Sequence, residues 1–103
     1  MTVQYGYSLD SGEIRWDMTA IKDLNETGIC ITTNICFAAG EAIYLRIQFP
    51  SKPFQWLEFK GRVIESKAGG LLTRVEFTDL SEYHKASIQE YIKWFLSAGK
   101  GGG

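Results

Sequence analysis

The sequence is poor in the residues that build metal sites and disulfide frameworks. It has 103 residues, of which only two are cysteines and one is a histidine. Cys30 and Cys36 have five residues between them and His84 lies far along the chain, so the three do not match the ligand spacing of a zinc site. Nothing in the sequence indicates an oxidising compartment. We therefore expect no metal site, and we expect both cysteines to be small residues in or near the core.

Recognisable catalytic groups are also lacking. A nucleophile needs a base within hydrogen-bond reach, and no serine or cysteine is evidently paired with His84, which we interpret as a solvated helix residue. The pair Gly69–Gly70 lacks the spacing of a phosphate-binding loop and the helix that would follow it. The sequence therefore predicts a protein that is not an enzyme, with no catalytic residues and no cofactor.

Long apolar runs and an excess of positive charge are absent as well. No run approaches the roughly 20 apolar residues of a membrane-spanning helix, and Met1–Gln4 lack the layout of a signal peptide. We therefore expect a cytoplasmic protein without membrane contact. The formal net charge is −1, which argues against nucleic acid as a partner, because such binding depends on many lysine and arginine contacts to phosphates.

What the sequence does have is an alternation of apolar and polar residues with period two, which is typical of antiparallel strands that bury one face. The alternation is clearest in 43–49, 57–63 and 71–77, and weaker strand signals cover 3–7, 17–22 and 29–33. Turn residues separate these segments at Asp10–Gly12, Ala39–Gly40, Pro50–Pro53 and Lys67–Gly70. About six short strands predict a mainly β fold, a six-stranded antiparallel β-barrel, because closure removes exposed edges.

A helix is predicted to follow the last strand. Asp79 is a good N-cap, and Glu82 stands three residues later, as in a capping box. Apolar residues then recur at helical spacing up to an expected stop at Gly99. We expect this stripe to pack on the barrel, although it could instead bind a partner helix. The predicted domain is 1–98, followed by a flexible glycine-rich tail at 99–103.

The strand and helix patterns together predict one shared core. Its barrel part consists of the inward apolar residues Ile43, Leu45, Ile47, Leu57, Phe59, Val63, Val75 and Phe77. On the helix, Ile88, Ile92 and Phe95 are expected to cap this core.

One segment, 23–28, carries polar residues in an arrangement that local structure or a ligand could explain. Asp23 and Asn25 are two apart, so in an extended chain their side chains share a face, while Leu24 points into the core. Gly28 ends the segment at a turn, where positive φ is often needed. The simplest interpretation is an Asx-type turn in which both side chains bond to local backbone.

The pattern Asp-x-Asn-x-x-Gly of Asp23, Asn25 and Gly28, followed by the apolar strand 29–31, resembles the motif of the PilZ domain family, in which serine usually stands where this chain has Asn25. Gly40, the tripeptide Gly61-Arg62-Val63 and the segment 75–81 also look like PilZ sequences in the same order, so the likeness covers nearly the whole chain. The resemblance implies a six-stranded antiparallel barrel with a C-terminal helix, in agreement with the alternation.

The usual ligand of PilZ domains is cyclic di-GMP, a bacterial second messenger, so the resemblance implies a regulatory module that binds it through Asp23, Asn25 and Gly28. An ionised aspartate can accept the two N–H donors of the guanine Watson–Crick edge, and Asn25 offers a donor and an acceptor. The family's second motif, Arg-x-x-x-Arg just before the first strand, does not occur in this sequence. We therefore expect weak binding or none, unless a strand supplies a cation from Arg15, Arg62 or Arg74.

The sequence leaves two functions open. The first is cyclic di-GMP sensing with arginines supplied from outside the chain, and the second is a degenerate PilZ domain that contacts a protein partner or a neighbouring domain and binds no nucleotide. Two arginines separated by three residues upstream of Thr2 would favour the first, and a native start at Met1 would favour the second. We favour the first, because Asp23, Asn25 and Gly28 all retain groups that fit guanine.

Overall fold

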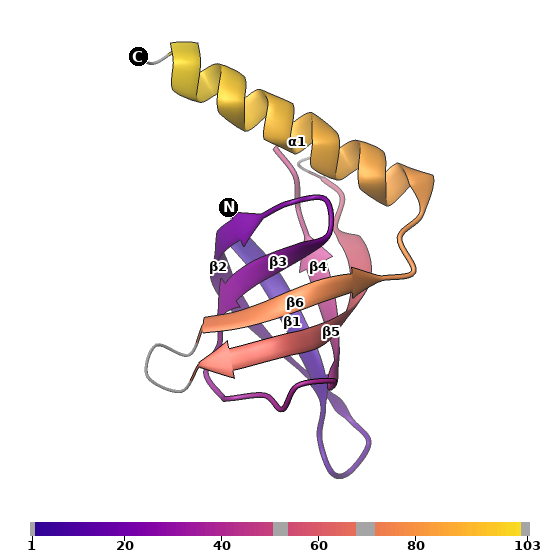
Figure 1. Ribbon diagram of the computed structural model, residues 1–103. Helices are drawn as coiled ribbons and strands as arrows, with labels where there is room; N and C mark the ends of the chain where they lie inside the picture. The colour runs from indigo at the N-terminus through magenta and orange to yellow at the C-terminus, as the bar shows by residue number, and fades with distance from the viewer. Residues whose placement is uncertain (1, 51–53, 68–71, 102–103) are drawn as a thin grey trace.

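Six antiparallel strands close into a barrel, and one helix lies across an end of it (Figure 1). The computed structural model describes residues 2–50, 54–67 and 72–101, with side chains as far as residue 96. The elements are β1 (Thr2–Ser8), β2 (Ile14–Leu24), β3 (Gly28–Thr32), β4 (Ala42–Ile47), β5 (Leu57–Lys67), β6 (Leu72–Thr78) and α1 (Glu82–Gly101). Around the barrel the strands follow the order β1-β2-β3-β6-β5-β4, so the predicted six-stranded barrel with a C-terminal helix is confirmed.

The turns hold the expected residue types at two of the four predicted reversals. Gly12, in the β1–β2 hairpin, and Gly40, just before β4, both have positive φ, which glycine adopts without steric cost. The reversals predicted at Pro50–Pro53 and Lys67–Gly70 lie largely outside the described residues. Among those residues, no helix combines the length and the apolar content that a membrane crossing requires.

The inward side chains of the strands form the core, as the period-two alternation predicts. All eight barrel residues expected there are buried, and Val3, Tyr5, Ile29, Ile31, Phe37 and Phe49 join them. Thr73 is also buried, and its hydroxyl lies 2.8 Å from that of Thr33, so this inward polar pair is satisfied. Neither cysteine is part of the core: Cys30 is half-buried on the outer face, and Cys36 is exposed in the segment before β4, where its Sγ donates to the Ser66 carbonyl.

The helix begins two residues later than the sequence suggests, with a different cap. Asp79 has a left-handed φ of 56° and does not cap α1. Instead the Ser81 Oγ accepts a hydrogen bond from the His84 N–H at 3.1 Å, and His84 Nδ1 accepts one from the Ser81 N–H at 3.3 Å. This is the reciprocal arrangement of a capping box, with His84 in the role expected of Glu82. His84 is also not simply solvated, because its ring lies 4.4 Å from that of Phe59.

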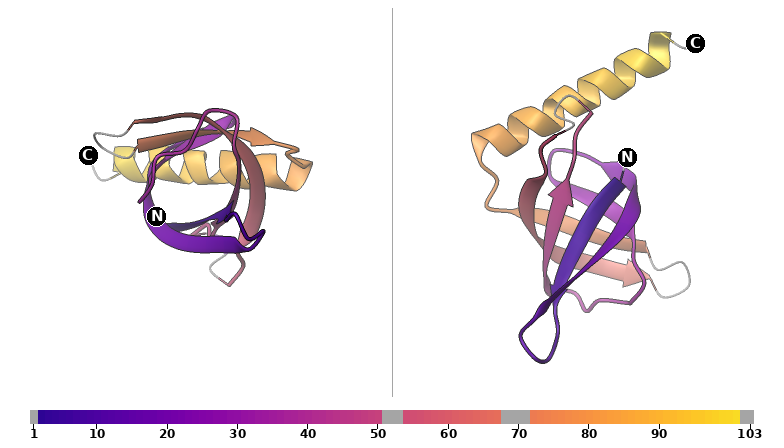
Figure 2. Two further views of the ribbon diagram at one scale, coloured as in Figure 1. Left: turned by 90° about the horizontal axis from the view of Figure 1, so that it is seen from below. Right: turned by 180° about the vertical axis from the view of Figure 1, so that it is seen from behind.

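Only the first half of α1 packs on the barrel. Ile88 is fully buried and Ile92 is half-buried, but Phe95 is 59% exposed, so the prediction that Phe95 caps the core is wrong. The reason is visible in Figure 2: the C-terminal half of the helix extends past the end of the barrel. The helix also continues through Gly99, its expected stop, to Gly101.

Candidate functional site

The Asp-x-Asn-x-x-Gly pattern spans the end of β2, the turn after it and the first residue of β3, and β6 pairs with β3 beside it. In the sheet register, Asp23 of β2 pairs with Cys30 of β3, and Cys30 pairs with Arg74 of β6. Their side chains therefore form one row across three strands, directed away from the core. We call this surface, with Asn25 and Gly28 beside the row, the motif face.

Asn25 builds the turn between β2 and β3. Its Oδ1 accepts three hydrogen bonds, from the Thr27 N–H at 2.9 Å, the Thr27 hydroxyl at 2.8 Å and the Gly28 N–H at 2.9 Å. The Asn25 N–H in turn donates to the Gly28 carbonyl at 3.0 Å. The side-chain oxygen is thus occupied by its own loop, and the Nδ2 amide is the part of Asn25 that can meet a ligand.

Asp23 takes no part in that turn. Its side chain is exposed, and within the described part of the chain its carboxylate has no hydrogen bond or ion pair. The Asx-turn interpretation therefore holds for Asn25 and not for Asp23. Leu24, the residue between them, packs against the core as expected. Asp23 is left as an outward acceptor with no structural role in the loop.

Gly28 is required by close approach and not by its backbone angle. It opens β3 opposite Glu76, and its φ is not in the left-handed region, contrary to the sequence expectation. A Cβ placed on Gly28 would overlap the carbonyl oxygen of Val75 on β6. The absence of a side chain therefore lets β3 pair closely with β6 beneath the motif face.

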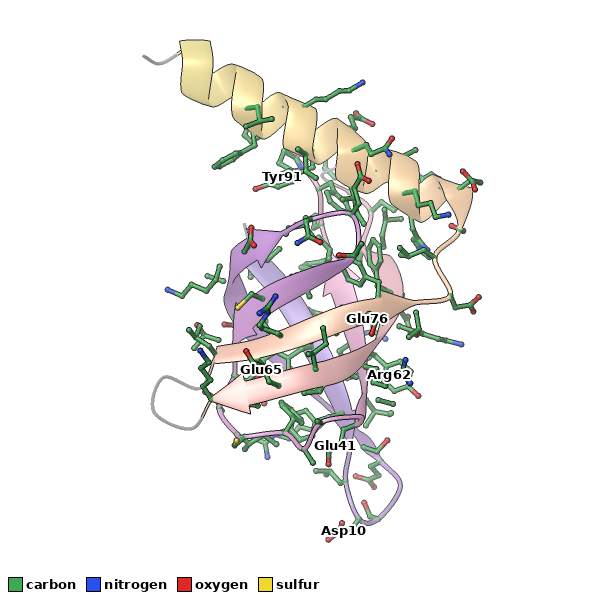
Figure 3. The ribbon with its side chains drawn as sticks, in the orientation of Figure 1. Asp10, Glu41, Arg62, Glu65, Glu76 and Tyr91 are labelled. Atoms are coloured by element: carbon green, nitrogen blue, oxygen red, sulfur yellow. The ribbon has the colours of Figure 1, made fainter. Side chains whose placement is uncertain are left out.

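Arg74 is the cation that the fold brings to this face. A shallow hollow of about 40 Å³ is lined by Asp23, Asn25, Gly28 and Arg74, among others, whereas Arg15 and Arg62 do not line it. The Arg74 Nη1 lies 3.8 Å from the Glu65 Oε1 across the β5–β6 pair, and both side chains are well exposed. Figure 3 shows Glu65 on this side of the barrel. Of the three arginines considered from sequence, the structure places Arg74 beside the pattern.

The second positive charge near the pattern, Lys22, does not line the hollow that holds Asn25 and Arg74, although Asp23 lines both that hollow and the one beside Lys22. The β2–β3 register shifts between Ile21 and Asp23, which marks a β-bulge at Lys22. Lys22 lines a different hollow, between β2 and α1. Glu26, at the tip of the turn, accepts a hydrogen bond from Gln89 of α1 at 3.4 Å. The turn that carries the pattern is therefore in direct contact with the helix.

Two further sets of polar groups lie outside the motif face. No group of three or more metal-ligating side chains occurs among the residues that the structure describes. The pKa of Tyr7 is raised by burial and by the nearby Asp17 carboxylate, to which the Tyr7 hydroxyl donates at 3.3 Å. A raised pKa keeps this phenol protonated, so Tyr7 acts as a hydrogen-bond donor within the fold.

Comparisons with known proteins agree with this architecture. The model of a family described as PilZ domain matches residues 1–94. A solved structure, the PilZ domain of CeSA from a cellulose synthesizing bacterium, has the same fold with a TM-score of 0.60 and 16% sequence identity, over 93% of this chain and 92% of that one. No curated protein is similar enough in sequence to match.

Proposed function

Because the chain belongs to the PilZ domain family, we propose that it is a regulatory module of bacterial cyclic di-GMP signalling, acting in the cytoplasm, that binds this nucleotide on the motif face. PilZ domains are in general regulatory modules that bind cyclic di-GMP, and they are not enzymes. The observation that carries the proposal for this chain is the row from Asp23 to Arg74, which sets an exposed carboxylate and a guanidinium on one surface.

Each group on the motif face has a distinct part in the proposed contact. The Asp23 carboxylate accepts the two N–H donors of a guanine Watson–Crick edge, and the Asn25 Nδ2 donates to a second polar atom. Arg74 offers its planar donors to guanine O6 and N7 or to a phosphate. Arg74 must break its ion pair with Glu65 to reach the ligand. The free-energy cost is small, because an exposed ion pair is worth about 0–1 kcal/mol. Gly28 contributes indirectly, because its lack of a side chain lets β3 pair closely with β6 and so holds Arg74 near Asp23.

The shallowness of the site supports a contribution from outside the chain. A hollow of about 40 Å³ cannot enclose a dinucleotide, so most of the ligand surface remains uncovered by these strands. The ligand carries two phosphate charges, and Arg74 alone does not offset both. We therefore place the remaining arginines on a segment beyond this chain, which folds over the bound nucleotide.

Calorimetric titration with cyclic di-GMP, on a chain extended upstream of Thr2, tests the role of Arg74. We expect Arg74→Ala to lose roughly 1–3 kcal/mol of binding free energy, the usual worth of an arginine that reads guanine. Arg15→Ala is the matched control, because Arg15 is 61% exposed against 63% for Arg74 and lies at the other end of β2. Equal affinity of the Arg74→Ala variant and the parent chain would remove Arg74 from the site.

A second function is supported by a separate observation. Trp94, Phe95 and Leu96 are all more than half exposed on α1, which fits a PilZ domain that contacts protein and binds no nucleotide. The same titration, carried out on a chain extended upstream of Thr2, distinguishes the two functions. Measurable binding by the extended chain supports the first function, and no heat at millimolar ligand supports the second.

A further inference from the structure

A groove of ligand size lies next to the motif face, between α1 and the end of β2. Its volume is about 470 Å³, against about 40 Å³ for the hollow that holds Asn25 and Arg74. Binding sites for small molecules commonly measure about 300–1,000 Å³, so the groove has room for a large part of a nucleotide and the hollow does not. Asp23 lines both, so the groove and the motif face meet at its carboxylate.

A β-bulge brings Lys22 and Asp23 to the same groove. Neighbouring residues of a regular strand point to opposite faces. Here the β2–β3 register shifts between Ile21 and Asp23, so Lys22 is an extra residue in the ladder. Lys22 and Asp23 are both exposed and both line the groove, between the half-buried Ile21 and Leu24. The bulge therefore sets an ammonium donor beside a carboxylate acceptor, and neither side chain has an ion pair within the described part of the chain.

The helix side of the groove is apolar and partly aromatic. Phe95 lines it together with the half-buried Tyr91 and Ile92, and the Phe95 and Tyr91 rings lie 6.2 Å apart. Figure 3 shows Tyr91 on the side of α1 that faces the barrel. Phe95 is 59% exposed, so much of its ring surface is open to a planar ligand. Aromatic side chains of this kind stack on the faces of nucleobases.

The polar pair at the groove matches the Watson–Crick edge of guanine. That edge presents the acceptor O6 beside two N–H donors. The Asp23 carboxylate can accept from the two donors, while the neighbouring Lys22 ammonium donates to O6. Adenine has an amino donor in place of O6, so it would meet the lysine with a donor. The groove therefore offers guanine both a stacking surface and groups that distinguish it from adenine.

We propose that the groove between β2 and α1 is a guanine subsite, in which one base of cyclic di-GMP stacks on Phe95 while Asp23 and Lys22 bind its edge. This inference rests on the proposed function, because it assigns a place to one of the two bases of that ligand. The phosphates and the second base then extend over the motif face towards Arg74. The exposed Phe95 belongs in this arrangement to the ligand site.

Calorimetric titration of cyclic di-GMP into a chain extended upstream of Thr2 tests the stacking contact. We expect Phe95→Ala to weaken binding by roughly tenfold or more, the usual effect of removing an aromatic side chain that stacks on a base. Trp94→Ala is the control, because Trp94 is also more than half exposed on α1 but lines a different hollow, beside Pro50. Far-ultraviolet circular dichroism of each variant shows whether the fold is intact. Undiminished affinity of the Phe95→Ala variant overturns the subsite alone, whereas no binding by the unsubstituted extended chain overturns the proposed function and the subsite together.

Substitution of Lys22 tests whether the base in the groove is bound as guanine. Cyclic di-AMP carries the same two phosphates as cyclic di-GMP, but its bases have an amino donor in place of O6. We expect the extended chain to prefer cyclic di-GMP, and we expect Lys22→Met to lower this preference several-fold, because the donor to O6 is lost. Lys60→Met is the control, because Lys60 is exposed on β5 and lines neither the groove nor the motif-face hollow. A lysine that only offsets phosphate charge would weaken both ligands equally, so an unchanged preference in the Lys22→Met variant overturns the assignment of the base edge to this pair.

Discussion

Asp23 and Asn25 share one spacing pattern but have separable roles at the level of single residues. The Asn25 Oδ1 holds the β2–β3 turn through three hydrogen bonds, whereas the Asp23 carboxylate is outward and unbonded among the described residues. A substitution at Asn25 therefore disturbs the loop as well as any ligand contact. A substitution at Asp23 reports on the ligand alone, which makes Asp23 the better probe of the proposed function.

We expect Asp23→Ala to change the free energy of unfolding by less than about 0.5 kcal/mol, as at ordinary surface positions. In a chain extended upstream of Thr2, the same variant should lose most of its cyclic di-GMP binding, because the guanine donors then have no carboxylate to meet. Urea denaturation and calorimetry measure the two effects separately. An Asp23→Ala variant that unfolds would show instead that the carboxylate supports the turn.

A second single-residue substitution, at Phe59, tests which face of β5 points into the core. Its side chain is 1% exposed and lies between the Phe77 and His84 rings, at centroid distances of 5.1 and 4.4 Å. Truncation to alanine removes these contacts and leaves a cavity, so Phe59→Ala should lower the free energy of unfolding by about 3–5 kcal/mol. Chemical denaturation measures this loss, and a change below about 0.5 kcal/mol would contradict the inward placement of Phe59.

At the scale of elements, the strands were predictable and the ends of the helix were not. Period-two alternation identifies which residues face inward, because side chains on a strand alternate strictly between faces. The helix start is harder, because Asp79 and Ser81 are both good N-caps, and only the left-handed backbone at Asp79 decides between them. Helical periodicity also placed Phe95 on the face of Ile88, but it carries no information on where the barrel beneath α1 ends.

Replacement of the cap residues distinguishes the two possible helix starts. Ser81→Ala removes the oxygen that accepts from the His84 N–H, so we expect it to cost about 1 kcal/mol of stability. Glu82→Ala should change stability by less than about 0.5 kcal/mol, because Glu82 is exposed and is not the capping partner. Thermal unfolding of both variants makes the comparison. A larger loss at Glu82 than at Ser81 would restore the capping box that begins at Asp79.

At the scale of the whole molecule, the candidate site depends on strand pairing between distant parts of the sequence. The pattern at 23–28 was visible in the sequence, but its neighbour Arg74 lies 46 positions beyond Gly28 and reaches it only because β3 pairs with β6. Three arginines on strands were candidates, and nothing local separates Arg74 from Arg15 or Arg62. The choice follows from barrel order and register, which alternation within single strands does not determine.

The assembled site predicts the affinity of this chain for cyclic di-GMP. One guanidinium, from Arg74, faces a ligand with two phosphates and two guanines, and Glu65 competes for it. Two further arginines on an upstream segment would each add roughly 1–3 kcal/mol, so their absence weakens binding by about a hundredfold or more.

We therefore expect residues 1–103 to bind cyclic di-GMP weakly or not at all, and a chain extended to include such arginines to bind at least about a hundredfold more tightly. Titration calorimetry of both chains in one buffer makes the comparison, and a repeat at higher salt should weaken the extended chain more, since more of its contacts are ionic. A dissociation constant below about 1 µM for residues 1–103 would contradict the proposal that part of the binding site lies on an upstream segment. In that case Arg74 and the motif face would form a complete binding surface, and no upstream segment would be needed to close it.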